Sequence, residues 1–281
     1  MSDELFSIGT AAKLCGVSTR TLRLYADCGL IVPKKIDEET GYRYYDEATL
    51  ECISIIKYYK QLGFGLNEIK NLIESSVCLE HYDSLLERMK VLKKKQVVIY
   101  NSYVASKDWA KLIHEGSMAA CQKEPSVNMK YYPADNSYCS LEQSYSYNFR
   151  QSCINLAWTQ HLEKMDWEIT GPIILKFDSW REKIAGKAER ATILQECLQA
   201  LEYPEKMIVY GGFMGLSCYH LGDLEGIEQT YERMREYADS HHYKIHDESY
   251  ERYVIDYWTT SSTNKFVTEI IIPISSPDMN E

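Results

Sequence analysis

The first apolar positions of the chain follow helical spacing. Residues 8–14 have apolar side chains near intervals of three and four, between Ser7, a residue type that caps helix N-termini, and Gly16, a residue type that ends helices. Ser18 is placed to cap a second short helix over residues 19–25. Two short helices joined by a turn that contains glycine predict a helix-turn-helix.

The next segment alternates turn residues with apolar and basic ones. Residues 33–45 have an acidic, turn-rich centre flanked by apolar and basic side chains, which predicts a small β-hairpin, or wing. Two further helices are expected over residues 47–62 and 66–75, separated by the sequence Gly-Phe-Gly at 63–65.

A long uninterrupted helix is predicted after this unit, because residues 78–113 contain neither glycine nor proline. Apolar and large side chains recur there at alternating spacings of three and four, at Tyr82, Leu85, Met89, Leu92, Gln96, Ile99 and Tyr103. Such a heptad seam favours a coiled coil between two chains. The alternative is an ordinary helix packed against its own domain.

The remaining residues predict an α+β domain. Strands are expected over 128–147, 173–177, 206–219, 249–258 and 265–274, and helices over 149–165 and 226–240. Their order hints at a duplicated unit, and residues 178–205 fit no element. We therefore expect a helix-turn-helix domain at 1–77, a long coiled-coil helix at 78–114, a linker at 115–127 and an α+β domain at 128–281.

The net charge of −10 is unevenly distributed. Residues 116–281 carry 15 basic and 25 acidic side chains, so the acid excess belongs to the C-terminal part. A duplex repels that part, whereas a cation is attracted to it.

Cysteine usage and the lack of an apolar span predict a cytoplasmic protein with no membrane partner. The nine cysteines are widely spaced without a C-x-x-C pair, which disfavours a disulfide framework and a metal cage. The apolar stretches are too short to span a bilayer, and the first seven residues lack the basic start of a secretion signal. No spacing indicates a catalytic set or a cofactor, so an enzyme is not expected.

The second helix and the wing supply the candidate DNA contacts. Arginine reads guanine edges or clamps phosphate, and phosphate contacts position a protein whereas base contacts give sequence preference. We expect phosphate contacts from Arg23, Tyr42 and Arg43, base contacts from Ser18, Thr19 and Arg20, and a further contact from Tyr25. The alternative for each arginine is a solvated surface residue.

Residues 6–13, 16–25, 29–31, 41–45 and 62–69 together resemble the opening of a MerR-family regulator. Leu24 departs from the pattern, since the family often has an aromatic residue before Tyr25. The resemblance implies a winged helix-turn-helix and a homodimer joined by an antiparallel coiled coil. It further implies a promoter whose two hexamers lie too far apart for RNA polymerase. Effector binding would then kink and untwist the spacer DNA, converting repression to activation.

The C-terminal part resembles the GyrI-like effector-binding domain of multidrug-sensing MerR regulators, in segments 171–174, 224–235, 249–256 and 267–274. Of the 23 tyrosines in the chain, 14 lie after residue 115. The resemblance identifies Glu251 as the central acid of the effector pocket.

Strand alternation puts Glu251 on one face with Tyr253, Ile255 and Tyr257. A carboxylate flanked by tyrosines suits a lipophilic cation. Glu269 is a second candidate acid, and the candidate aromatic wall consists of Tyr145, Tyr147, Trp180 and Tyr219. The alternatives are a salt bridge between Glu251 and a neighbouring base, and plain core packing for the aromatics.

Three rival functions remain open at this point. The first is a hydrolase built on the GyrI-like domain, in which a buried glutamate acts as general base. The second is a metal or thiol sensor that uses Cys78 and Cys121. The third is a regulator whose C-terminal domain docks another protein.

Overall fold

The computed structural model describes residues 4–75, 77–122, 124–145 and 156–275. The chain divides into two compact units, residues 1–98 and 99–281, and the boundary falls within one long helix. None of the helices in these described ranges is long and apolar enough to cross a membrane.

The N-terminal unit contains the predicted helix-turn-helix and wing. Its elements are β1 (Phe6–Ser7), α1 (Ile8–Cys15), α2 (Thr19–Asp27), β2 (Lys35–Ile36), β3 (Arg43–Tyr45), α3 (Glu47–Gln61) and α4 (Leu66–Glu74). The caps expected from sequence are present. Ser7 Oγ accepts from Thr10 N–H at 3.2 Å, and Gly16 ends α1 with φ at +60°.

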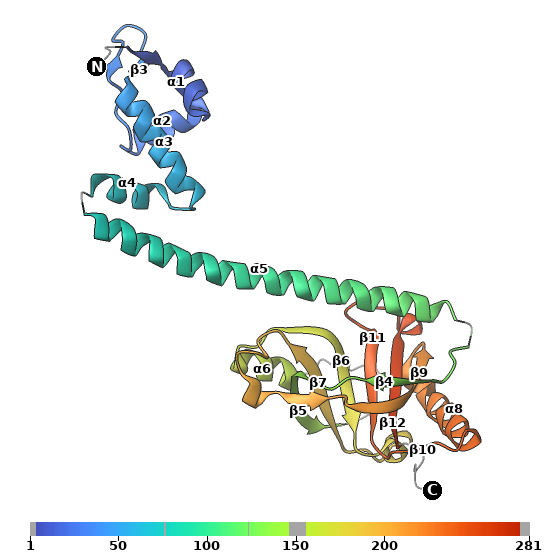
Figure 1. Ribbon diagram of the computed structural model, residues 1–281. Helices are drawn as coiled ribbons and strands as arrows, with labels where there is room; N and C mark the ends of the chain where they lie inside the picture. The colour runs from blue at the N-terminus through green and yellow to red at the C-terminus, as the bar shows by residue number, and fades with distance from the viewer. Residues whose placement is uncertain (1–3, 76, 123, 146–155, 276–281) are drawn as a thin grey trace. The chain divides into compact units, whose positions relative to one another are not determined.

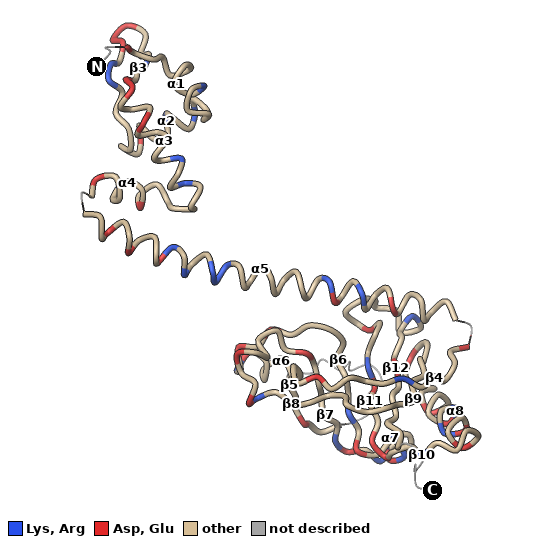
Figure 2. Tube along the Cα trace, viewed as in Figure 1, with Lys and Arg blue, Asp and Glu red and all other residues tan. Residues whose placement is uncertain are grey.

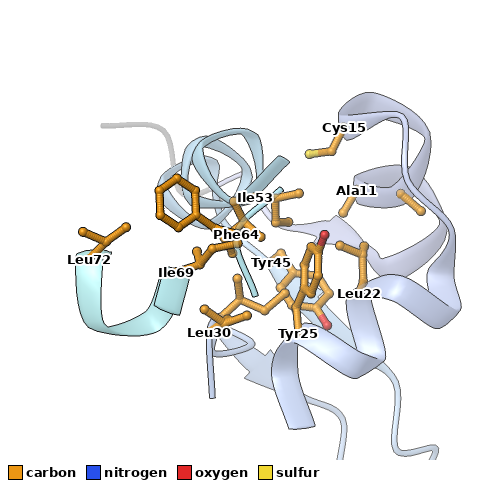
Figure 3. Packing of buried hydrophobic residues seen from close by; sticks show 13 residues of the cluster. Ala11, Cys15, Leu22, Tyr25, Leu30, Tyr45, Ile53, Phe64, Ile69 and Leu72 are labelled. Atoms are coloured by element: carbon orange, nitrogen blue, oxygen red, sulfur yellow. The ribbon is translucent and has the colours of Figure 1, made fainter. Parts of the chain in front are cut away.

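A single hydrophobic cluster holds these short elements together. Figure 3 shows Leu22 and Tyr25 of α2 near Tyr45 of β3 and Ile53 of α3, with Phe64 and Ile69 on the α4 side. Leu22, Tyr45, Ile53 and Ile69 are fully buried. Because α2 buries only one stripe in this cluster, its other face remains available for contacts.

Helix α5 (Cys78–Ala120) is 43 residues long and passes from one unit into the other (Figure 1). It extends six residues beyond the end expected at 114, so the first part of the expected linker is helical. The glycine in this extension has a packing reason. Gly116 is buried, and a Cβ atom there would overlap with Ile255 Cγ1 on the sheet, so the helix and the sheet approach closely.

The C-terminal unit is an α+β domain built around a nine-stranded sheet. Its helices are α6 (Leu156–Met165), α7 (Trp180–Ile184) and α8 (Ile227–Ser240). The strands are β4 (Asn128–Tyr132), β5 (Asp135–Ser144), β6 (Ile169–Phe177), β7 (Arg190–Cys197), β8 (Ile208–Tyr210), β9 (Phe213–Leu221), β10 (Lys244–Ile245), β11 (Ser249–Ile255) and β12 (Val267–Ser275).

The sheet order reveals an internal repeat. The strands run β4-β9-β12-β11-β6-β7-β5-β8, with β10 paired to β12. The segments β5-α6-β6-β7 and β9-α8-β11-β12 share one order, and in each the last strand lies between the other two. The two halves meet where β6 pairs antiparallel with β11, with Leu175 opposite Glu251. The duplication suggested by the sequence is therefore present in the topology, and Glu251 lies at its centre.

Three expected elements differ from the structure. The strand expected over 128–147 is β4 and β5, separated at Pro133. The strand expected over 206–219 is β8 and β9, because Gly211 and Gly212 turn the chain with φ of +93° and +81°. Residues 178–205, which fitted no element, contain α7 and the buried strand β7.

Candidate DNA interface and effector pocket

The exposed face of α2 carries most of the predicted base contacts. Thr19, Arg20 and Arg23 are exposed. Ser18 is the N-cap of α2, and its Oγ accepts from Thr21 N–H at 3.0 Å, so its hydroxyl already has a structural partner. Tyr25 is only 5% exposed and packs in the core, because it lies on the same stripe as Leu22. The structure therefore offers Thr19, Arg20 and Arg23 more directly than Ser18 or Tyr25.

The wing supplies two further side chains beside α2. Tyr42 is 59% exposed. Arg43 is half-buried and lies 3.5 Å from Asp27 at the end of α2, which ties the wing to the helix. At the wing tip, Asp37 accepts hydrogen bonds from the backbone and hydroxyl of Thr40 at 2.8 and 2.6 Å, and these bonds lower the pKa of Asp37.

Glu251 is fully buried and lies in a polar cluster on one face of the sheet. Lys183 Nζ of α7 lies 2.6 Å from its Oε1, and Tyr231 of α8 donates to the same oxygen at 2.9 Å. Tyr253 donates to Oε2 at 3.0 Å. Burial and the nearby Glu251 raise the pKa of Tyr231, so its hydroxyl keeps its proton to donate.

The Lys183 ammonium also faces aromatic rings. It lies 5.3 Å from the ring centre of Tyr231 and 5.7 Å from that of Phe177. We call the set of Glu251, Tyr231, Tyr253 and Phe177 the cation box. A carboxylate, two phenol donors and two ring faces are the groups that hold an organic cation, and here they hold the chain's own lysine.

A pocket of about 550 Å³ opens beside the cation box. Lys183 is one of its lining residues, together with Tyr145, Leu224 and Ile227, and with Glu189, Glu225 and Glu228. The volume lies within the range of about 300–1,000 Å³ that is usual for small-molecule pockets. Lys183 therefore separates the pocket from the buried carboxylate of Glu251.

Glu269 belongs to a different cluster on the opposite face. Arg252 pairs with Glu269 across β11 and β12, and successive strand residues face opposite ways, so Glu251 and Glu269 are on different faces. Glu269 Oε2 accepts from Arg252 Nε at 2.6 Å, and its Oε1 accepts from Ser217 and Tyr132 at 2.6 and 3.0 Å and contacts Lys130. Burial alone would raise the pKa of Glu269, but Arg252 and Lys130 lower it to about 2.

This second cluster extends to helix α5. Arg252 is also paired with Glu115 of α5, and Tyr219 donates to Glu115 at 2.6 Å. We call Glu115, Arg252, Glu269 and Lys130 the α5 charge chain. It links the C-terminal part of α5 to β11, the strand that also carries Glu251.

The candidate effector residues are thus divided between two sites. Tyr145 lines the pocket beside the cation box and Tyr253 belongs to that box, whereas Glu269 belongs to the α5 charge chain and Tyr219 donates to its Glu115. Trp180 is 1% exposed, and its ring stacks on that of Tyr231 with ring centres 6.1 Å apart, so it packs against the cation box. Tyr147 lies outside the described residues. The expected alternation holds for Glu251 and Tyr253 but is wrong for Ile255, which packs against α5 after an irregularity at 253–255, and it does not extend to Tyr257 because β11 ends at Ile255.

The sequence did not indicate four residues of these two clusters, namely Lys183, Tyr231, Arg252 and Glu115. They lie on four elements, and the ion pair between Lys183 and Glu251 spans 68 positions of the chain. The α8 segment that contains Tyr231 did enter the resemblance, but no spacing indicated its partner.

The cysteines proposed for a metal or thiol sensor lie at the ends of α5. Cys78 is the first residue of α5 and belongs to the N-terminal unit, whereas Cys121 follows the last residue of α5 and belongs to the C-terminal unit. The described residues also contain no group of three or more His, Cys, Asp or Glu arranged to hold a metal.

Two protein families match separate parts of the chain. The family described as "MerR HTH family regulatory protein" matches residues 6–76. The family described as "GyrI-like small molecule binding domain" matches residues 204–275, which include β8 to β12 and α8.

Characterised relatives match over about a third of the chain. The mercuric resistance operon regulatory protein of Bacillus cereus is 36% identical over 95 residues, or 32% of this chain and 71% of that protein. The multidrug-efflux transporter 2 regulator of Bacillus subtilis is 38% identical over 102 residues, or 35% of this chain and 34% of that protein. The chain thus aligns with about a third of the multidrug regulator.

A solved structure aligns over nearly the whole length. The cryo-EM structure of the EcmrR–DNA complex in EcmrR-RPo covers 97% of this chain and 100% of that chain, at 19% identity and a TM-score of 0.46. The family match at residues 6–76 coincides with the winged helix-turn-helix, and the B. cereus regulator is 36% identical over 71% of its own length. The chain belongs to the MerR family of DNA-binding transcriptional regulators.

Proposed function

We propose that this regulator is a homodimer that distorts promoter DNA and switches that distortion when a small lipophilic cation binds its C-terminal unit. The observation that carries the effector part of the proposal is the cation box, in which Lys183 occupies a site with the chemistry of an organic-cation site. The match to a small-molecule binding domain and the similarity to a multidrug-efflux regulator support the same class of effector.

DNA binding is assigned to α2 and the wing. Thr19 and Arg20 would contact base edges from the major groove, and Arg23, Tyr42 and Arg43 would contact phosphates. RNA polymerase would bind the same promoter as the activated partner.

The homodimer would form along α5. Tyr82, Met89, Ile99 and Tyr103 of the predicted seam are 59 to 70% exposed in the single chain, and Leu85 and Leu92 are 36 and 44% exposed. Apolar side chains exposed in a continuous stripe favour a partner helix. Replacing Leu92 with Glu should convert the dimer to a monomer in sedimentation equilibrium, whereas Lys94→Glu on the face opposite the seam should not. A dimer that survives Leu92→Glu would contradict this interface.

The effector would take the place of the Lys183 ammonium. The pocket of about 550 Å³ admits the lipophilic part of the molecule, and its cation would pair with Glu251 after Lys183 moves aside. Because Lys183 belongs to the short helix α7, its displacement would move α7 against α8.

The α5 charge chain would carry this change to the dimer helix. Glu251 and Arg252 are neighbours on β11, and Arg252 pairs with Glu115 of α5. An effector that binds one arrangement of β11 and α5 more tightly than the other shifts the balance between them, and with it the energy of the deformed DNA.

Selection of the full-length protein's binding sites from random DNA, followed by transcription in vitro, tests the proposal. We expect an inverted repeat with a long spacer, and a lipophilic cation such as tetraphenylphosphonium should increase transcription without greatly changing DNA affinity. Recovery of no specific DNA would overturn the DNA assignment. Specific DNA without any response to cations would overturn the effector assignment alone.

A further inference from the structure

A second cavity lies where β6 and β11 separate. The two strands pair as far as Arg252 and Ile174, and both then become irregular, at 170–174 in β6 and 253–255 in β11. The space between them, about 230 Å³, is covered by Ala105, Trp109 and Leu112 of α5. All of these residues belong to the C-terminal unit.

The cavity has an apolar, aromatic wall. Ile169, Ile173 and Pro172 line it on the β6 side. Trp109 and Trp258 also line it, and their rings meet edge to face with centres 5.7 Å apart. Tryptophan presents the strongest ring face for a cation among the aromatic side chains.

Asp256 is the charged group of this wall. Its Oδ1 accepts from Trp258 N–H at 3.0 Å, and burial raises the pKa of its carboxyl group. Glu251 and Glu269 each pair with a lysine or an arginine, whereas no basic side chain of the described residues pairs with Asp256. Asp256 is half-buried, so a carboxylate without a cation there loses part of its hydration, and a bound cation would offset that loss.

We propose that this cavity is a second small-molecule site, which takes a one- or two-ring aromatic cation whose ammonium group pairs with Asp256 and whose ring packs against Trp109 and Trp258. The size sets the class of ligand. A cavity of about 150 Å³ holds benzene, and drug-sized ligands need about 300 Å³ or more, so this cavity fits a molecule between these limits.

The site differs from the effector pocket in its contact with the dimer helix. Three α5 residues form one wall, so a ligand here touches α5 directly, without the α5 charge chain, and Tyr253 is the one residue of the cation box that also lines this cavity. A ligand that fits only one position of α5 would shift the same equilibrium as the effector. The site itself does not depend on the proposed function of the Glu251 pocket.

Tryptophan indole N–H signals of the ¹⁵N-labelled full-length protein test this site. The probes are 1-naphthylmethylammonium and its uncharged isostere 1-naphthalenemethanol. We expect the cation to shift the signals of Trp109 and Trp258, assigned from Trp→Phe variants, and to leave that of Trp180 unchanged. Asp256→Asn should weaken cation binding at least tenfold and change binding of the alcohol little, whereas Asp239→Asn on the exposed part of α8 should change neither.

A second variant tests the cavity without the charge. Ala105→Leu should fill the space and weaken both probes. The site is overturned if neither Trp109 nor Trp258 responds, or if Ala105→Leu binds as the wild type does. The role of Asp256 is overturned if Asp256→Asn leaves cation affinity unchanged or weakens both probes equally.

Discussion

The two units differ in whether their charged side chains are buried. Among the described residues, the N-terminal unit buries no charged side chain, whereas the C-terminal unit buries Lys183, Glu251 and Glu269. Figure 2 shows the blue and red positions of both units along the trace. The N-terminal unit keeps Arg20 and Arg23 exposed, where they can contact a polyanion. The C-terminal unit uses paired buried charges, which require defined partners and therefore define sites.

This contrast predicts different consequences for the removal of a charge. In the N-terminal unit it should weaken DNA binding and leave folding nearly unchanged. In the C-terminal unit it should destabilise the fold, because the partner is left as an unpaired buried charge.

The largest effect is expected for Glu269→Gln, which leaves Arg252 and Lys130 without their shared carboxylate. The free energy of unfolding of the C-terminal unit should fall by about 3–5 kcal/mol. Tryptophan fluorescence during urea unfolding measures this unit selectively, because all five tryptophans lie after residue 98. Arg235→Ala, which breaks exposed ion pairs on α8, is the control and should cost about 0–1 kcal/mol. Equal losses of unfolding free energy in the two variants would contradict the claim that buried charge pairs contribute more to folding than exposed ones.

The pairing of Glu269 with Arg252 and Lys130 also predicts how stability depends on pH. The folded state lowers the pKa of Glu269 from 4.5 to about 2, so its contribution to stability is complete above about pH 4.5 and is lost as the pH falls towards 2. The difference in unfolding free energy between wild type and Glu269→Gln should therefore shrink over that window. A difference that stays constant from pH 6 to pH 2.5 would show that the carboxylate charge is not its source.

In the N-terminal unit, Arg20→Ala should weaken operator binding by about 1–3 kcal/mol and relax base preference at one position. Arg43→Ala should weaken binding to all sequences and reduce the slope of log affinity against log salt by about one. Fluorescence anisotropy with labelled operator DNA measures both effects, with Arg235→Ala again as the control. Neither arginine variant should alter dimerisation, and undiminished binding in either would remove the role assigned to that residue.

A smaller effect tests where α5 meets the sheet. Alanine normally stabilises a helix relative to glycine by about 1 kcal/mol. Gly116→Ala should instead destabilise the C-terminal unit by about 1 kcal/mol, because the added methyl group meets Ile255 and Val254. Urea unfolding followed by tryptophan fluorescence gives the sign, and a gain in stability would mean that α5 does not approach β11 so closely.

The contrast also explains which features the sequence could predict. The N-terminal fold depends on local signals, such as the Ser7 and Ser18 caps and the left-handed Gly16, and these can be found within a few residues. The position of Glu251 on a strand near tyrosines was also predictable, because strand alternation is local.

The C-terminal sites depend on contacts between distant segments. Nothing within several residues of Glu251 indicates Lys183 or Tyr231 as its partners. The face of Glu269 follows from its pairing with Arg252, and that register appears only in the folded sheet. Gly211 and Gly212 were visible as turn residues, but the segment 206–219 is apolar enough to have concealed the break between β8 and β9.

The most direct test of the account is a fluorescence titration of wild type, Glu251→Gln and Lys183→Met with lipophilic cations and uncharged analogues of the same shape. Glu251→Gln should weaken cation binding more than about tenfold, or 1.4 kcal/mol, and leave operator affinity intact. Lys183→Met should bind the cations at least about tenfold more tightly than wild type, because no internal ammonium competes for Glu251. The uncharged analogues should bind all three proteins with similar affinity. Equal cation affinity in wild type and both variants would contradict the claim that the cation box is the effector site.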